Sequence, residues 1–138
     1  MEYVLCDNNA MGKKIEEHLK KSGSWFTSVS HDLTTRNRLK ETCKEFPFWA
    51  WIDHSPDNGS DEEEVHFHTH FLVRTIGTRT IKQVADRLDI APNFVQVVRQ
   101  PRGIKRYFRH LDNPDKIQYS EDDIHTSHPS EFKIAAES

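Results

Sequence analysis

The chain has 138 residues, of which 35% are hydrophobic and 30% are charged, and its formal net charge is −3 at pH 7. This length suits one domain with a buried core, and no apolar run approaches the roughly 18 residues of a membrane span. The N-terminus lacks the basic-then-apolar order of a secretory signal, and the two cysteines, Cys6 and Cys43, match no zinc spacing. We therefore expect a cytoplasmic protein with free thiols and no membrane partner.

Charge is unevenly distributed along the chain. Residues 53–64 contain six acidic residues and no lysine or arginine, whereas residues 99–110 contain five basic residues and no acidic one. A chain of negative total charge can therefore present a cationic surface, and a solvated helix face is the alternative interpretation of the basic segment. The candidate DNA-binding residues in this segment are Arg102, Lys105, Arg106 and Arg109.

The first half of the chain predicts a helix, a strand, a second helix and a β-hairpin. Residues 12–21 have the pattern of a short charged helix, and the aromatic and β-branched residues of 24–32 predict a strand. A helix is predicted over 33–46, capped by one of the two threonines near its start. Strands 48–54 and 65–76 flank a polar segment that contains Asn-Gly, which favours an antiparallel hairpin.

The second half of the chain predicts a helix, a strand and another helix. Thr78 or Thr80 is expected to cap a helix that runs through 81–88, and residues 92–100 alternate as in a strand. A helix follows over 104–111, and the polar remainder predicts loop and a short terminal element. The order β-α-β-β-α-β-α predicts an α+β protein with a central antiparallel sheet of four to five strands flanked by helices.

Residues 78–100 allow a second interpretation as a helix-turn-helix, with Pro92–Arg99 as the recognition helix. A non-catalytic DNA-binding protein could be built on such a unit. Against it, residues 94–98 alternate β-branched and polar positions at period two, which suits a strand better than an exposed helix. A three-helix unit would also leave the histidine-rich strand unexplained.

His66, His68 and His70 alternate with other residues on the second hairpin strand, so their imidazoles are expected on one face of the sheet. Neutral imidazole binds divalent metals well, and two such ligands at i and i+2 can share one ion. The first hairpin strand ends near His54 and Asp57, which adds further ligand types. A mixed set of histidine and carboxylate without cysteine suits Mg²⁺ or Mn²⁺ acting on phosphates. A metal-binding regulatory module without a nucleophile is the alternative.

The chain resembles the HUH endonucleases, which include rolling-circle replication initiators, conjugative relaxases and certain transposases. The resemblance is carried by IDHSPD (52–57), by HTHFLV (68–73) and most specifically by RGIKRYFRHLDNPDKIQYS (102–120). It covers about residues 24–120 and is greatest to the Rep initiators of small rolling-circle plasmids.

The resemblance implies a metal-dependent, sequence-specific endonuclease that nicks and rejoins single-stranded origin DNA through a 5′-phosphotyrosine. Such an enzyme initiates rolling-circle replication of a plasmid and cooperates with host proteins such as a helicase and a polymerase. Residues 24–120 would form the HUH endonuclease domain, 1–23 an N-terminal extension with a short helix, and 121–138 a C-terminal tail that could pack on the domain. A viral initiator or a transposase with the same site is the alternative.

Carried over residue by residue, the resemblance implies that His68 and His70 are the paired metal ligands. His54 would be the third ligand and Asp57 the fourth, with Mn²⁺ or Mg²⁺ as the ion. One position departs from the family pattern, because the residue between the paired histidines is usually bulky and hydrophobic and is Thr69 here.

A second choice of the paired ligands follows from that departure. His66 and His68 flank Phe67 and so fit the family pattern literally. With His68 and His70 chosen as the pair, His66 is expected to support a ligand or to contact DNA, and the same is expected of His110.

Tyr107 would be the nucleophile, three residues before His110, a spacing that places two side chains on one helix face. The surrounding basic residues favour an approach lined for phosphate. Tyr119 is a weaker rival, because it lies beyond the predicted helix and away from the basic cluster.

Overall fold

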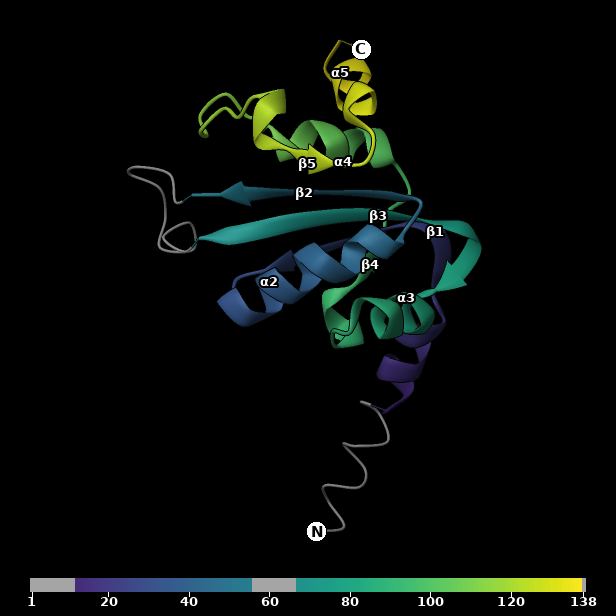
Figure 1. Ribbon diagram of the computed structural model, residues 1–138. Helices are drawn as coiled ribbons and strands as arrows, with labels where there is room; N and C mark the ends of the chain where they lie inside the picture. Colours follow the sequence, from purple (N-terminus) through teal and green to yellow (C-terminus); the bar gives the residue numbers. More distant parts are fainter. Residues whose placement is uncertain (1–11, 56–66, 138) are drawn as a thin grey trace.

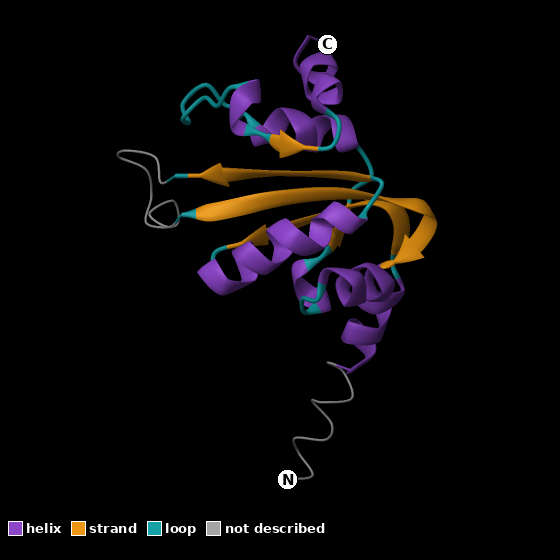
Figure 2. Ribbon diagram, viewed as in Figure 1, coloured by secondary structure: helices purple, strands orange, loops and turns teal. Residues whose placement is uncertain are grey.

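A five-stranded antiparallel sheet with helices on both faces forms the centre of the protein (Figures 1 and 2). The structure is a computed structural model that describes residues 12–55 and 67–137. The strands lie in the order β4-β1-β3-β2-β5. The predicted α+β class and antiparallel sheet are therefore confirmed.

The elements follow the predicted order, with a strand and a helix added at the C-terminal end. They are a helix over 12–20, β1 (Ser22–Ser30), α2 (Leu33–Thr42), the 3₁₀ helix η1 (Cys43–Glu45), β2 (Phe48–His54), β3 (His68–Thr80), α3 (Ile81–Leu88), η3 (Pro92–Phe94), β4 (Gln96–Val97), α4 (Pro101–Phe108), η4 (Glu121–Asp123), β5 (His125–Thr126) and α5 (Pro129–Glu137). Within the described part of the chain, no helix has the length and apolar character needed to cross a membrane.

β2 and β3 form the predicted antiparallel pair, and their register aligns the histidines. His54, the last residue of β2, pairs with His68, the first residue of β3, and Ile52 pairs with His70. Because side chains alternate between the two faces of a strand, the three histidines project from one face. The segment between the strands, 56–66, lies outside the described residues.

Two separate hydrophobic cores cover the two faces of the sheet, so the central strands are buried on both sides (Figure 1). This explains the continuous apolar run of β3, in which Phe71 and Leu72 face opposite cores. On the face of α2 and α3, the buried hydrophobic cluster consists of Phe26, Leu39, Cys43, Phe46, Phe71, Val73, Ile81, Val84, Ala85, Leu88 and Val95. On the face of α4 and α5, it consists of Phe48, Ala50, Ile52, Leu72, Phe108 and Phe132.

The C-terminal segment completes the sheet and covers the face that carries the histidines. β5 pairs with the outer edge of β2, where His125 lies opposite Trp51. α5 packs against α4 through Phe108 and Phe132, whose ring centroids lie 5.6 Å apart. Figure 1 shows the two helices together above the sheet, on the side opposite α2 and α3.

The cap of one helix and the start of another differ from the predicted ones. α2 is capped by Asp32 rather than by a threonine, because the Asp32 carboxylate accepts a hydrogen bond of 2.8 Å from the backbone N–H of Thr35. α4 begins at Pro101, three residues before its predicted start at Ile104. Proline is favoured at the first helical position, since its missing N–H has no partner there in any case. The cap of α3 is Thr80, one of the two predicted candidates.

The helix-turn-helix interpretation of residues 78–100 is wrong. Pro92–Phe94 forms a single 3₁₀ turn, and Gln96–Val97 then pairs with β1 as the short strand β4. A recognition helix over 92–99 is therefore absent, and the strand predicted over 92–100 is only two residues long. Val95 is fully buried between the turn and the strand, which accounts for the strand-like alternation.

Candidate active site

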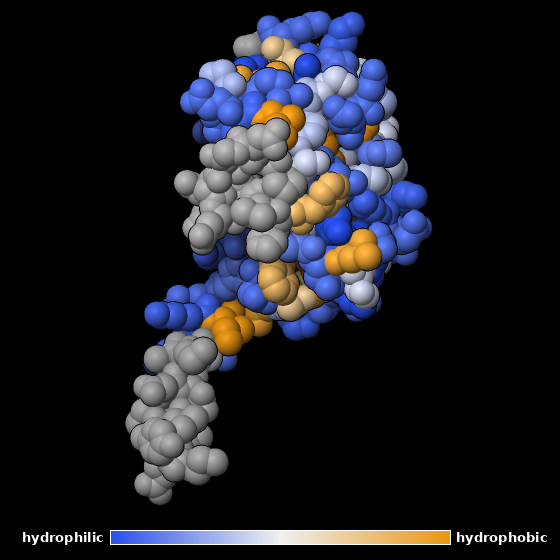
Figure 3. All heavy atoms as spheres, turned by 90° about the vertical axis from the view of Figure 1, so that its left-hand side faces the viewer, coloured by the Kyte–Doolittle hydropathy of each residue, from blue (hydrophilic) through white to orange (hydrophobic). Residues whose placement is uncertain are grey.

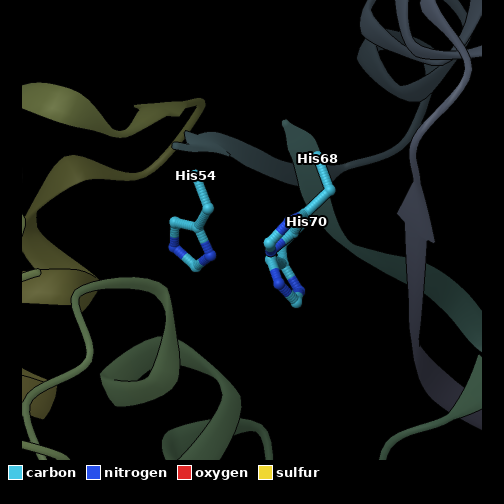
Figure 4. A group of neighbouring side chains, drawn as sticks. All are labelled: His54, His68 and His70. Carbon is cyan, nitrogen blue, oxygen red and sulfur yellow. The ribbon is translucent and has the colours of Figure 1, made fainter. Parts of the chain in front are cut away.

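Three buried histidines from two neighbouring strands form a compact group (Figure 4). His54 comes from the end of β2, and His68 and His70 come from the start of β3. One ring nitrogen of each lies within 4.8 Å of the others, a spacing at which the three could hold a metal ion. The structure thus brings together three of the predicted ligands, while Asp57 and His66 lie outside the described residues.

The hydrogen bond made by His54 determines which of its nitrogens can bind an ion. Its Nε2 lies 2.8 Å from the backbone carbonyl oxygen of Phe108. A carbonyl oxygen can only accept, so Nε2 carries the proton and the neutral ring has its lone pair on Nδ1. A metal-binding histidine commonly donates its other N–H in this way, which fixes its tautomer and orientation.

His70 is held in the neutral form that a metal requires. Burial, followed by the nearby His54 and His68, lowers the pKa of His70 to about 2. Its Nε2 is buried and has no hydrogen-bond partner within residues 12–55 and 67–137. Buried polar atoms normally have a partner, and an ion bound by the three histidines would supply one. The residues present therefore fit a divalent cation.

Tyr107 lies on α4 beside this group. Its ring centroid is 5.0 Å from that of His70 and 6.2 Å from that of His54. The residue is 41% exposed, so it lies at the boundary between the buried histidines and solvent. The predicted nucleophile and the predicted ligands are therefore neighbours, although α4 is distant from both strands in the sequence.

His110 occupies a backbone conformation that histidine rarely adopts. Its φ is 57°, and it follows Arg109, the C-cap residue of α4, in a Schellman motif, with His110 N–H bonded to Tyr107 O and Leu111 N–H bonded to Arg106 O. Glycine is the usual residue there, because a Cβ in the left-handed region costs about 1–2 kcal/mol. The ring of His110 is buried, and its centroid lies 4.2 Å from that of His54. The strained backbone thus places an imidazole directly beside the histidine group.

Tyr119 contacts the histidine group, a role that was not predicted from the sequence. Its ring stacks on His54, with centroids 4.8 Å apart, and its hydroxyl accepts a hydrogen bond of 2.8 Å from the backbone N–H of Ser55. This tyrosine therefore holds the end of β2, although its sequence context had suggested only a rival nucleophile. Its presence in the family-like segment 102–120 was the only signal available in the sequence.

Two of the predicted DNA-binding residues connect α4 to the C-terminal segment. Lys105 Nζ lies 2.8 Å from the carboxylate of Glu131 on α5. The guanidinium of Arg106 donates to the carboxylate of Asp112 and, from Nη1, to the carbonyl oxygen of Ala135 at 2.9 Å. Both cations are therefore engaged within the protein.

The other two predicted DNA-binding residues differ in exposure. Arg109 Nε donates to the carbonyl oxygen of Tyr119 at 2.9 Å, and its Nη1 lies 3.7 Å from Glu121. Arg102, on the first turn of α4, is exposed. It is the cation of the four with the most accessible side chain for a phosphate.

Comparisons with known proteins show which family the chain resembles in sequence. Residues 12–134 match the family described as plasmid replication protein, origin binding domain. The chain is also similar to the replication protein RepB of Lactiplantibacillus plantarum, with 25% identity over 114 residues, which cover 82% of this chain and 52% of RepB. The chain thus spans about half the length of this curated relative.

Proposed function

The chain belongs to the origin-binding domain family of plasmid replication proteins, and we propose that it nicks and rejoins single-stranded origin DNA to initiate rolling-circle replication of a plasmid. The proposal rests above all on the position of Tyr107, whose ring lies 5.0 Å from that of His70 in a group that could hold a metal ion. A phenol beside a cation site is what a tyrosine-dependent DNA endonuclease requires.

Mn²⁺ or Mg²⁺ is the proposed cofactor, with His54, His68 and His70 as ligands and Asp57 as the fourth. When bound, the ion would polarise the scissile phosphate and stabilise the charge that develops on its oxygens. The chain supports this role by keeping His70 neutral through burial and by orienting His54 through the Phe108 carbonyl.

Tyr107 is the proposed nucleophile. Its phenolic oxygen forms a bond to phosphorus while the bond from phosphorus to the 3′ oxygen breaks. The phenol loses its proton, and the departing 3′ oxygen gains one and becomes a 3′-hydroxyl that a host polymerase can extend. The 5′-phosphotyrosine conserves the energy of the broken ester, so attack by a 3′-hydroxyl rejoins the strand.

A flexible single strand is the proposed substrate, because the phosphate must reach a phenol that is only partly exposed. Arg102 is proposed to contact its backbone. Figure 3 shows the side of the molecule that lies at the left of Figure 1, and outside the residues drawn in grey hydrophilic side chains predominate on this side, with hydrophobic ones in separate patches. Such a surface suits a charged ligand. We also propose that the protein is cytoplasmic and that a host helicase acts together with it.

The test is the formation of a covalent adduct. The protein is incubated with Mn²⁺ and an oligonucleotide that spans the origin and is labelled at its 3′ end, so that the labelled fragment is the one joined to tyrosine. We expect a labelled protein band on a denaturing gel, its loss in Tyr107→Phe and its retention in Tyr119→Phe. An adduct that survives Tyr107→Phe would overturn the assignment of the nucleophile.

A further inference from the structure

A chain of polar contacts lies on the face of the sheet opposite the three histidines. The Thr69 hydroxyl donates a hydrogen bond of 2.5 Å to Asp53 Oδ1, and Lys40 Nζ lies 3.2 Å from Asp53 Oδ2. Thr69 is fully buried, and Lys40 also lies over the ring of Trp51, with Nζ 4.1 Å from its centroid. We call Lys40, Asp53 and Thr69 the polar clamp.

The polar clamp joins the immediate neighbours of the candidate ligands. Asp53 precedes His54 in β2, and Thr69 lies between His68 and His70 in β3. Asp53 and Thr69 are also directly opposite one another in the β2–β3 register. The hydrogen bond between their side chains therefore links the end of β2, which carries His54, to the start of β3, which carries His68 and His70.

The sheet is narrow where the histidines lie. The β2–β3 pairing extends to His54 and His68 at the end of the sheet. The pairing of β1 with β3 extends only to Thr69 and does not reach His68. On the other side, β5 pairs with β2 only as far as Trp51. Within residues 12–55 and 67–137, the pair formed by His54 and His68 therefore has no paired strand on either side. Element ends of this kind are where backbone pairing opens most easily.

A metal site tolerates little such movement, because its ligands must be held within about 0.5 Å of the required geometry. The hydrogen bond of the clamp crosses the sheet one pair before its end, and a hydrogen bond to a carboxylate is stronger than one between neutral groups. The ion pair between Lys40 and Asp53 connects the clamp to α2. Leu39, next to Lys40 on that helix, is fully buried in the core.

We propose that Lys40, Asp53 and Thr69 are positioning residues that set the spacing of the ligand histidines from behind. The inference rests on the proposed metal centre. The proposed role gives a reason for Thr69, at a position where the HUH endonucleases that the chain resembles usually have a bulky hydrophobic residue. The threonine hydroxyl makes a hydrogen bond to Asp53 that a hydrophobic side chain cannot make.

The test is Co²⁺ binding followed by visible absorption, on the full chain. Thr69→Val keeps the shape and strand preference of the side chain and removes only the hydroxyl. We expect it to bind Co²⁺ about tenfold more weakly, with a changed spectrum, and we expect Thr69→Ser to restore binding. Thr75→Val is the matched control, because Thr75 is also buried in β3 and its hydroxyl donates to the carbonyl of Gly77 at 2.6 Å. That variant should keep wild-type affinity and spectrum.

Asp53→Asn tests the contribution of Lys40. The amide oxygen can still accept from Thr69, but the charge that pairs with Lys40 is lost, so we expect a smaller loss of affinity than in Thr69→Val. Wild-type affinity in Asp53→Asn would overturn the role of Lys40.

The outcomes separate this inference from the proposed function. Wild-type Co²⁺ binding by Thr69→Val, or an equal loss in Thr75→Val, would overturn the clamp alone. Failure of the wild-type protein to bind Co²⁺ would overturn the proposed metal centre and the clamp with it. Because the readout is metal binding, neither result depends on DNA cleavage.

Discussion

Tyr107 and His70 contact each other edge to face, with ring centroids 5.0 Å apart and ring planes inclined by 72°. His70 is buried and neutral, whereas Tyr107 is partly exposed on the helix that covers the sheet. The contact therefore joins a histidine of the group that could hold a metal ion to a tyrosine that is partly exposed to solvent.

Tyr107→Phe should separate chemistry from structure. The variant keeps the ring contact with His70 and removes only the hydroxyl, so the free energy of unfolding should change by less than about 0.5 kcal/mol. Co²⁺ affinity should stay at the wild-type value while adduct formation is lost. Urea unfolding and a Co²⁺ titration check the two expectations. A large loss of Co²⁺ binding would indicate that Tyr107 is a ligand rather than the nucleophile.

The metal-free protein should lose stability in acid because of His70. Its pKa is lowered to about 2 in the folded protein, whereas an unfolded histidine has a pKa of about 6.5. The unfolded chain therefore binds a proton that the folded chain does not, and the contribution, complete above pH 6.5, is lost as the pH falls towards 2. The slope from this group is at most about 1.4 kcal/mol per pH unit.

Urea unfolding between pH 7 and pH 5 measures this slope, and His70→Gln is the control. Glutamine is polar but does not titrate, so the variant should show a shallower pH dependence than the wild-type protein. An unchanged slope in His70→Gln would assign the acid sensitivity to other groups.

Substitutions at His110 should distinguish the cost of its backbone from the use of its ring. Glycine tolerates the left-handed conformation and alanine does not, so His110→Gly should be more stable to urea than His110→Ala by about 1 kcal/mol. Both variants remove the ring that packs beside His54, and both should bind Co²⁺ more weakly than the wild-type protein. Equal stability of the two variants would contradict the strain assigned to this position.

Arg102 and Arg106 should respond differently to replacement by alanine. Arg102 is exposed, so Arg102→Ala should leave the thermal midpoint unchanged and reduce the salt dependence of DNA binding by about one phosphate contact. Arg106 is bonded to Asp112 and to the end of α5, so Arg106→Ala should lower the thermal midpoint. DNA binding as a function of salt and thermal unfolding measure the two effects. An unchanged salt dependence in Arg102→Ala would remove this residue from the DNA contact.

The strands and helices that position the site follow from local patterns in the sequence. Alternating residues and an Asn-Gly turn predicted the β2–β3 pair, and Thr80 with the amphipathic residues after it predicted α3. The strand predicted over 92–100 is only two residues long in the structure. The alternation of residue types indicates that Val95 is buried, but it does not indicate how many residues pair with a neighbouring strand.

The residue types of the site follow from composition, and the strand face of the histidines follows from their period of two, so both can be predicted without a structure. Which distant residues meet there depends on the three-dimensional packing. It brought Tyr107 to His70, stacked Tyr119 on His54 and bonded Asp53 to Thr69. These contacts depend on how α4 and its following loop pack on the sheet and on the register of two strands. Such long-range geometry results from the packing of the whole core and therefore leaves no short-range signal in the sequence.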